Sequence, residues 1–186
     1  FLLSTHAVSR AFVDESAQQP HEEDAPELKI PLPPGARNYS TPRGAARLRA
    51  ELSELQQAQR PRLMAAIGQI GDTDKDALAV QRRKLREMDR RIEYLVRMCS
   101  NLEVIDPALQ SSDRVIFGAT VTVREEGGAE KTYRIVGVDE ADPAEGSISW
   151  VSPVARALVS RRVGDTAILK LPEGSARLEI TGIRFE

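Results

Sequence analysis

The sequence predicts an α+β protein in which an N-terminal antiparallel α-helical coiled-coil hairpin precedes an antiparallel sheet domain with a short helix. Two observations support this. Apolar residues recur with helical spacing over residues 40–106, where one segment repeats every seven residues. From residue 112 the pattern changes to the alternation of apolar and polar residues that is typical of strands. We therefore expect a flexible tail over 1–39, the hairpin over 40–106 and the sheet domain over 112–186.

Composition narrows the class of protein. Charged residues make up 29% of the chain, but the net charge is only −2, so total charge does not indicate a nucleic-acid binder. The single cysteine, Cys99, excludes an internal disulfide framework and favours a reducing compartment such as the cytoplasm. No apolar run approaches the roughly 18 residues of a membrane span. The opening "FLLSTHAVSRAF" lacks the basic start of a signal peptide.

The tail is expected to be flexible because it combines proline, acidic and small residues without a period. Its histidines, His6 and His21, have no partners at metal-ligand spacing. The first helix is expected to begin with Thr41 as N-cap and Pro42 in the first turn, where a missing N–H costs nothing. Pro61 should kink this helix without ending it. The apolar face comprises Leu48, Leu52, Leu55, Leu63, Ile67 and Ile70.

The second helix carries a heptad pattern. One seam position holds Leu78, Leu85, Ile92 and Cys99, and the other holds Gln81, Met88, Leu95 and Leu102. Two helices of similar length joined by a short turn must lie antiparallel, and about 29 residues of helix extend ~43 Å. Cys99 at a seam position is expected to be a small buried hydrophobe rather than a reactive thiol.

Strands are expected within five segments, with a hairpin turn at Gly127–Gly128. A short helix interrupts them, with Ser152 as its N-cap and Pro153 in its first turn. The segments are "RVIFGATVTVREE", "KTYRIVGVD", "SISWVS", "TAILKL" and "RLEITGIRF".

Three aspartates, Asp72, Asp74 and Asp76, lie at or beside the turn between the helices. Two interpretations compete. One aspartate can cap the second helix while the others are solvated turn residues. Alternatively, the carboxylates contribute to a Mg²⁺ site. Three carboxylates on a loop do not make a full cage, so a partner would have to supply the other ligands.

A basic stretch follows the turn: Arg82, Arg83, Lys84, Arg86, Arg90 and Arg91. It can be a solvated helix face with i,i+4 pairs such as Glu87 with Arg91. Few acidic partners are available, however, so the stretch can instead hold a nucleic-acid backbone beside the acidic turn. RNA phosphate is the partner that would explain both features.

Several motifs in order resemble the bacterial transcript-cleavage factors GreA and GreB, from about Tyr39 to the C-terminus, with GreB the closer match. The hairpin contributes "STPRGAARLRAEL", "RP" at 60–61 and "KLREMDRRIEYL". The second domain contributes "RVIFGATVTV", "TYRIVGVDEAD", "SPVARAL" and "VGD". The segment "SRAFVDES" is similar to the start of some Gre-like proteins, and from this resemblance we expect Phe1–Ala7 to lie upstream of the natural start.

The resemblance implies an FKBP-like second domain and an accessory factor rather than an enzyme. In the family, this domain docks at the secondary channel of RNA polymerase, and the coiled coil carries its acidic tip to the polymerase active site. There the tip helps to hold Mg²⁺ shared in trans while the polymerase hydrolyses its own backtracked transcript. A cytoplasmic monomer is implied, with no membrane partner and with only indirect contact to DNA.

Residues are carried over by position. Asp72 matches the metal-binding aspartate. The second carboxylate position falls on Lys75 without a gap, and on Asp74 with one deletion; Asp76 completes the acidic set. Residues matching the region that faces the RNA 3′ segment are Arg82, Arg83, Lys84, Arg86 and Arg90. Residues matching the polymerase-docking face are Asp139, Glu140, Asp142, Ser152 and Pro153.

The stretch between Arg60–Pro61 and Gly71–Asp72 is about three residues shorter than in GreB, which corresponds to ~4.5 Å of helix. An alternative therefore stays open: a DksA-like or anti-cleavage regulator that enters the channel without promoting cleavage. Two further alternatives are a peptidyl-prolyl isomerase and a coiled-coil adaptor unrelated to polymerase. No nucleophile–base pair or Cys/His cluster supports an autonomous enzyme.

Overall fold

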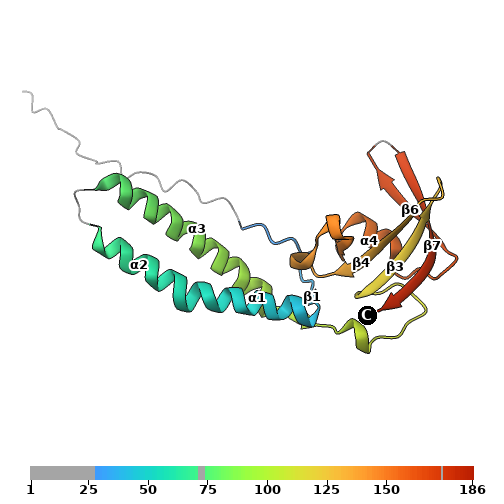
Figure 1. Ribbon diagram of the computed structural model, residues 1–186, viewed down its shortest axis with the longest axis horizontal. Coiled ribbons are helices and arrows are strands. Elements are labelled where there is room, and N and C mark those ends of the chain that lie inside the picture. Colours follow the sequence, from blue (N-terminus) through green and yellow to red (C-terminus); the bar gives the residue numbers. More distant parts are fainter. Residues whose placement is uncertain (1–27, 71–73, 173) are drawn as a thin grey trace, which may run out of the picture.

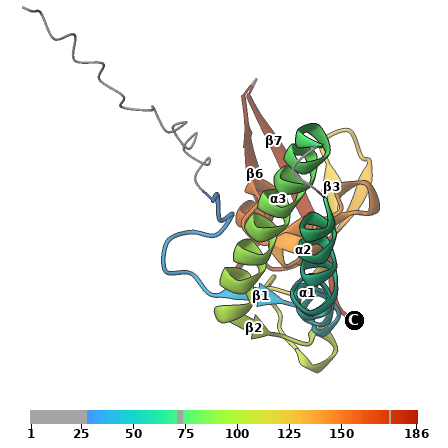
Figure 2. The same ribbon diagram turned by 90° about the vertical axis from the view of Figure 1, so that its left-hand side faces the viewer.

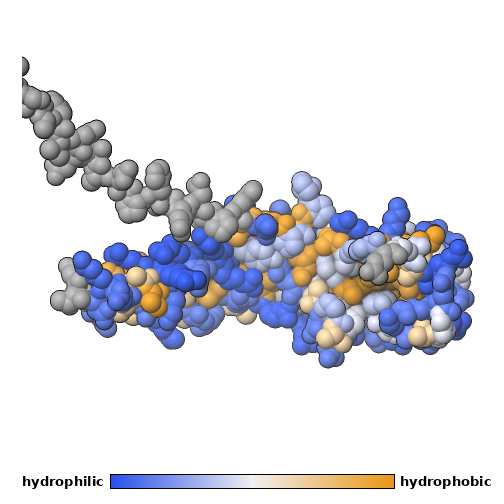
Figure 3. All heavy atoms as spheres, turned by 90° about the horizontal axis from the view of Figure 1, so that it is seen from above, coloured by the Kyte–Doolittle hydropathy of each residue, from blue (hydrophilic) through white to orange (hydrophobic). Residues whose placement is uncertain are grey.

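The protein is an elongated α+β molecule in which a helical finger projects from a sheet domain (Figure 1). This computed structural model describes residues 28–70, 74–172 and 174–186. Viewed along the finger, its two arms lie side by side in front of the sheet domain (Figure 2). Hydrophilic residues cover most of the finger's visible face in Figure 3. Among the described residues, none of the helices combines the length and the apolar character that crossing a membrane requires.

The first arm of the finger is a continuous helix with a widened turn. Helix α1 (Pro42–Glu54) leads through the π-helical segment η1 (Leu55–Gln59) into α2 (Arg60–Gln69). Pro61 has no N–H to donate, and its ring would crowd the carbonyl group four residues earlier. The helix widens just before Pro61: the Arg60 N–H bonds to the Leu55 carbonyl oxygen, five positions back instead of four. Pro61 thus alters the helix without ending it.

The second arm is α3 (Lys75–Ser100), which packs antiparallel against α1 and α2. The predicted seam is confirmed, because Leu78, Leu85 and Ile92 are all more buried than their neighbours on the outer face. Full burial begins only near the base of the finger, at Leu95 and Met98. Cys99 is half-buried, and burial raises the pKa of its thiol.

A short parallel ladder closes the base of the finger. Strand β1 (Asn38–Ser40) pairs with β2 (Leu102–Val104), which directly follows α3. Asn38 is 1% exposed, and its side chain donates to the Met98 carbonyl oxygen at 3.0 Å. The structure therefore places Asn38 and Tyr39 in a strand rather than in the expected tail. The 3₁₀ turn η2 (Pro107–Leu109) then leads into the sheet domain.

The sheet domain is built on five described strands in the order β5-β4-β3-β7-β6. Their bounds are β3 Ala119–Glu125, β4 Glu130–Val136, β5 Ser147–Ser149, β6 Thr166–Leu171 and β7 Gly174–Phe185. The turn at Gly127–Gly128 is confirmed: Gly128 has a φ of 83°, and its N–H bonds to the Glu125 carbonyl oxygen. A register shift between Thr122 and Val123 interrupts the β3–β7 ladder.

The expectation of a wholly antiparallel sheet is wrong for one pair. Strand β5 runs parallel to β4. Between β4 and β5 the chain passes through the 3₁₀ turns η3 (Val138–Glu140) and η4 (Pro143–Glu145). This crossover lets β5 run in the same direction as β4 along its edge. This crossover also brings η3 against the base of the finger.

The core of the sheet domain lies between the sheet and α4 (Pro153–Leu158). Ser152 caps α4 as predicted, with its Oγ accepting from the Ala155 N–H at 3.2 Å. The buried core residues are Val115, Ala119, Val121, Val123, Ile135, Ile148, Ala155, Leu158, Ala167, Leu178 and Ile180.

Candidate functional site

The acidic turn of the finger is described in part. Asp74 is the N-cap of α3, and its Oδ1 accepts from the Ala77 N–H at 2.9 Å. The prediction that an aspartate caps the second helix is therefore confirmed. Asp76 lies exposed in the first turn, where a carboxylate complements the positive end of the helix dipole. Asp72 lies outside the described residues, so the predicted three-aspartate metal set stays a prediction.

A basic stripe follows on α3. Arg82, Arg86 and Arg90 are four residues apart, which places them on one side of the helix over about 12 Å. Arg82 and Arg86 are exposed and Arg90 is half-buried. Arg83 and Lys84 are also exposed, and Arg83 Nε donates to Glu87 Oε1 at 3.1 Å. Within the described residues, Arg83 alone of these five cations forms an ion pair.

The expected pair of Glu87 with Arg91 is not formed. Arg91 faces the first arm instead and donates to both carboxylate oxygens of Glu51, at 2.7 and 2.8 Å. It also lies over the Tyr94 ring, 5.1 Å from the ring centroid. Arg91 thus ties the two arms together and is unavailable to the basic stripe. Arg60 and Asp89 form a second bridge between the arms at 2.7 Å.

The residues carried over as a docking face do not share one role. Asp142, Ser152 and Pro153 lie at the starts of η4 and α4, where Asp142 and Pro153 are exposed. Asp142 Oδ1 accepts from the Ala144 N–H at 3.2 Å, so it shapes its own turn while it faces solvent.

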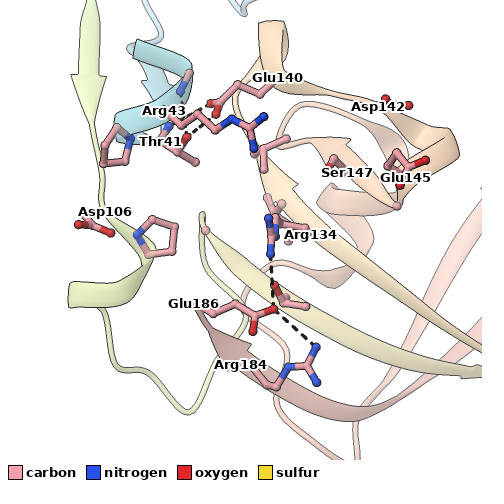
Figure 4. A pocket seen from close by; sticks show the side chains of 18 of the residues that line it. Thr41, Arg43, Asp106, Arg134, Glu140, Asp142, Glu145, Ser147, Arg184 and Glu186 are labelled. Atoms are coloured by element: carbon pink, nitrogen blue, oxygen red, sulfur yellow. Dashed lines mark hydrogen bonds and ion pairs between the residues drawn. The ribbon is translucent and has the colours of Figure 1, made fainter. Parts of the chain in front are cut away.

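Glu140 instead holds the finger to the sheet domain (Figure 4). Its Oε2 accepts from Ser40 Oγ at 2.9 Å, from the Thr41 N–H at 3.0 Å and from the Gly137 N–H at 3.2 Å. Its Oε1 accepts from Thr41 Oγ1, which in turn accepts from the Gly44 N–H. The carboxylate of Glu140, in the sheet domain, therefore accepts hydrogen bonds from the residues just before α1 and joins the two regions. We call this set of bonds the Glu140 clamp.

Asp139 is also engaged within the chain. Its Oδ1 accepts from the Tyr94 hydroxyl at 2.8 Å, and its backbone oxygen accepts from the Arg47 guanidinium. Burial, followed by this bond to Asp139, raises the pKa of Tyr94 above its usual range. The other oxygen, Oδ2, is buried without a partner among the described residues. These contacts show that Asp139 and Glu140 are engaged within the chain, and their predicted docking roles stay predictions.

Gly44 is the residue in the sequence that indicates the close approach of Glu140 to α1. A Cβ at Gly44 would lie 2.0 Å from Glu140 Cδ, so no larger residue fits there without moving the carboxylate. Glycine has a low helix propensity, so a glycine in the first turns of a helix destabilises it relative to alanine. Its presence there is explained when another element approaches too closely for a side chain. The glycine indicates a close contact, but nothing local names Glu140 as the partner.

A pocket of about 840 Å³ lies between the start of α1 and the outer face of the sheet (Figure 4). Arg43 and Arg47 line it from α1, and Thr120, Arg134 and Arg184 line it from the strands. Sequence reasoning did not single out any of these five residues, because they meet only when the finger docks on the sheet domain.

Comparisons of the sequence with known proteins identify a family. A family model described as transcription elongation factor GreA/GreB, C-terminal part, matches residues 110–185. GreB of Neisseria meningitidis serogroup B is 38% identical over 154 residues, covering 80% of this chain and 94% of that protein. GreA of Rhodospirillum rubrum is 42% identical over 150 residues, covering 78% and 96%.

Two solved structures show weaker similarity. GreA/GreB from Nitrosomonas europaea is 22% identical with a TM-score of 0.37, covering 81% of this chain and 99% of that chain. GreA factor homolog 1 of Thermus thermophilus is 21% identical with a TM-score of 0.36, covering 80% and 99%. The sequence relatives carry the assignment, since they match over nearly their whole length at 38% and 42% identity. The chain belongs to the GreA/GreB family of transcription elongation factors.

Proposed function

We propose that this elongation factor binds in the secondary channel of bacterial RNA polymerase and stimulates cleavage of backtracked transcripts. One observation carries the proposal: a helical finger, anchored at its base, leads away from the sheet domain to a turn that bears aspartates. The first arm contains helical segments of 13, 5 and 10 residues. At 1.5 Å per residue these extend about 42 Å. A long narrow element of this kind suits delivery of a few side chains into a deep channel.

The tip contributes carboxylate oxygens to Mg²⁺ that is shared in trans with the polymerase. The donor type fits, because Mg²⁺ prefers carboxylate oxygens and keeps ligands from several sources. Asp72, Asp74 and Asp76 are the candidates, and Asp74 is exposed although it caps α3. When bound, the metal would supply Lewis-acid stabilisation and an activated water for phosphodiester hydrolysis. The finger positions the carboxylates, and the polymerase performs the reaction.

The basic stripe faces the RNA 3′ segment. Arg82, Arg86 and Arg90 form a line along the shaft just behind the tip. Cations without acidic partners attract phosphate more strongly than cations in ion pairs, and binding of this kind weakens with salt. Arg82 should therefore matter more than Arg83, which Glu87 partly neutralises.

The sheet domain docks on the polymerase through Asp142, Ser152 and Pro153. We also propose that this domain is FKBP-like, as the family resemblance implies, and that the factor works as a cytoplasmic monomer that meets DNA only through the polymerase. Asp139 and Glu140 act indirectly, because they fix the direction in which the finger leaves the docked domain.

A second candidate function is a channel regulator of the DksA-like or anti-cleavage type. The observation that favours it is at the tip: Asp74 is committed to capping α3, and Lys75 occupies the next position. A capping carboxylate has one oxygen less to offer a metal. The two functions differ in one measurable outcome, which is the release of RNA.

The test uses purified bacterial polymerase halted in a backtracked complex with end-labelled RNA. Adding the wild-type protein should release a short 3′ fragment, and Asp72→Ala should abolish release while binding to polymerase is retained. Glu54→Gln is the matched control, since it removes an exposed carboxylate from the shaft of the finger. Binding without release, together with competition against a cleavage-active Gre factor, would favour the regulator. Equal release by Asp72→Ala would contradict the tip assignment.

The RNA contact is tested in the same system with complexes backtracked by different distances. Arg82→Glu combined with Arg83→Glu should reduce cleavage most on long backtracked RNAs, because those RNAs pass along more of the stripe. Arg49→Glu, an exposed charge reversal on α1 near the base, is the control. A uniform loss at all backtrack lengths would argue against RNA contact.

A further inference from the structure

The pocket beside α1 has a polar floor that the proposed tip chemistry does not use. Thr120 on β3 pairs with Arg134 on β4 and with Arg184 on β7. Residues directly opposite on neighbouring strands present their side chains on the same face of a sheet. The three side chains therefore form one row, a hydroxyl between two guanidinium groups, and all three line the pocket.

Thr120 carries an unsatisfied polar group. It is 3% exposed, and its Oγ1 has no hydrogen-bond partner among the described residues. A buried hydroxyl without a partner costs about 1–3 kcal/mol, whereas valine would fill the same volume without that cost. Two other threonines on this face, Thr122 and Thr132, lie beside each other, with 3.5 Å between their hydroxyl oxygens. Among the described threonines of this face, the hydroxyl that is buried without a partner is therefore the one on the pocket floor.

The two arginines hold a carboxylate loosely. Glu186 Oε1 lies 3.5 Å from Arg134 and 3.7 Å from Arg184, as the dashed lines in Figure 4 show. Charge-assisted hydrogen bonds are shorter, at about 2.7–2.9 Å. The side chains are also about half exposed, at 50% for Arg134, 61% for Arg184 and 51% for Glu186. Such pairs contribute little stability and exchange readily.

We infer that Thr120, Arg134 and Arg184 form a receptor for one carboxylate side chain of a protein partner, for which Glu186 is a stand-in. The inference rests on the proposed function in one respect: the partner is the polymerase. Two guanidinium groups and a hydroxyl match a carboxylate that accepts several hydrogen bonds at once. The partner's Asp or Glu displaces Glu186 and satisfies Thr120 Oγ1 when the sheet domain docks.

The surroundings favour a protein carboxylate over a phosphate. Arg43 and Arg47 line the pocket from α1, but they are outnumbered by the carboxylates of Asp106, Glu140, Asp142 and Glu145. The charges of these carboxylates disfavour a doubly charged anion but tolerate a single carboxylate, particularly one with a cation near it in the partner. Asp142 belongs to the proposed docking face, so the pocket is continuous with that face.

The test measures equilibrium binding of labelled full-length protein to core polymerase. Thr120→Val should weaken binding about ten- to a hundredfold, the cost of losing one hydrogen bond to a charged group. The same variant should unfold no more easily than wild type, because it removes an unsatisfied hydroxyl. Thr122→Val is the matched control on the same strand and face and should bind as wild type. Arg134→Gln with Arg184→Gln should weaken binding further, and Glu186→Gln, which frees both guanidinium groups, should tighten it.

The outcomes separate this inference from the proposed function. If wild-type protein does not bind polymerase, the proposed function fails. If wild type binds but Thr120→Val and Thr122→Val bind equally well, the carboxylate receptor is excluded and the proposed function stands. Inorganic phosphate is the competing probe. If millimolar phosphate shifts the Arg184 side-chain NMR signals while the Thr120 and arginine variants bind polymerase normally, the floor is a small-anion site and the inference is overturned.

Discussion

The sheet domain and the outer half of the finger bury their side chains to very different extents. In the sheet domain, residues such as Ile135 and Leu158 are completely buried between the strands and α4. Among the described residues of the finger, fully buried side chains occur only near its base, for example at Leu48, Leu95 and Met98. Helix α2 has no buried residue at all. Two helices alone cannot enclose a core, because each covers only one stripe of the other.

This difference shows where the finger gets its rigidity. Its base is held by β1 and β2, by the Glu140 clamp and by the Tyr94–Asp139 bond. Its outer half relies on a partly buried seam, while bridges between the arms lie near the middle, at Arg60 with Asp89, and nearer the base, at Arg91 with Glu51. Charged groups near the tip can therefore stay exposed, because the outer half of the finger has no core that they would disturb. The direction of the finger is set at its base.

The largest effect is expected from truncating the core of the sheet domain. Leu158→Ala should lower the free energy of unfolding by about 3 kcal/mol, since it leaves a cavity among well-packed neighbours. Leu85→Ala, in the half-buried seam of the finger, should cost only about 1 kcal/mol. Urea unfolding followed by the fluorescence of Trp150, which packs against the core, measures the first change.

Ile168→Ala is the control for that comparison, because Ile168 is 58% exposed on β6 and its truncation should change stability very little. Equal costs for Leu85→Ala and Leu158→Ala would mean that the finger has a closed core, and the contrast drawn between the two regions would be wrong.

The next effect concerns the clamp between the two regions. Glu140→Gln should cost about 2 kcal/mol, because it weakens the charge-assisted bonds from Ser40, Thr41 and Gly137. Hydrogen exchange should increase at the first turns of α1 before it increases in the sheet. Glu145→Gln, an exposed change in the neighbouring turn η4, should leave both readouts unchanged. Unaltered protection of α1 in Glu140→Gln would show that the clamp does not hold the finger.

Local patterns in the sequence predicted much of this fold. Thr41 and Ser152 cap helices as their spacing indicated, since a cap needs only the residues of the following turn. One of three aspartates was expected to cap the second helix, and the structure shows that it is Asp74. The seam of α3 and the turn at Gly127–Gly128 likewise depend on short-range pattern. The three-residue strand β1 escaped prediction because so short a segment shows no period, and its partner lies beyond the whole hairpin.

The site was less predictable for the same reason. Glu140 binds Thr41 across 99 positions of chain, and no local pattern distinguishes a clamping glutamate from an exposed one. Arg91 likewise bonds across the hairpin to Glu51, although its neighbour Glu87 offered an equally good local partner. Residues whose role depends on docking of two regions become visible only when both are folded.

A smaller, pH-dependent effect is expected at Tyr94. Burial and the bond to Asp139 raise the pKa of Tyr94 in the folded protein above 10, its ordinary value. The contribution of Tyr94 to stability is thus complete below pH 10 and is lost as the pH rises above 10 toward the folded-state pKa. Tyr94→Phe should cost about 1 kcal/mol at neutral pH. It should also remove this part of the alkaline loss, as measured by urea unfolding at several pH values. Parallel alkaline curves for the two proteins would contradict the assignment.

The smallest effect distinguishes the two kinds of ion pair on the finger. Glu87→Gln removes a pair within one exposed helix face and should lower the free energy of unfolding by at most about 0.5 kcal/mol. In 0.5 M salt, which screens exposed charges, the variant and the wild type should be almost equally stable. Glu51→Gln removes a bidentate pair that joins the arms, so it should cost up to about 1 kcal/mol and loosen the seam as well. The comparison is made by thermal unfolding followed by far-UV circular dichroism. If both variants melt alike, the bridges between the arms add nothing beyond exposed surface charge, and the seam residues alone must account for the order of the outer finger.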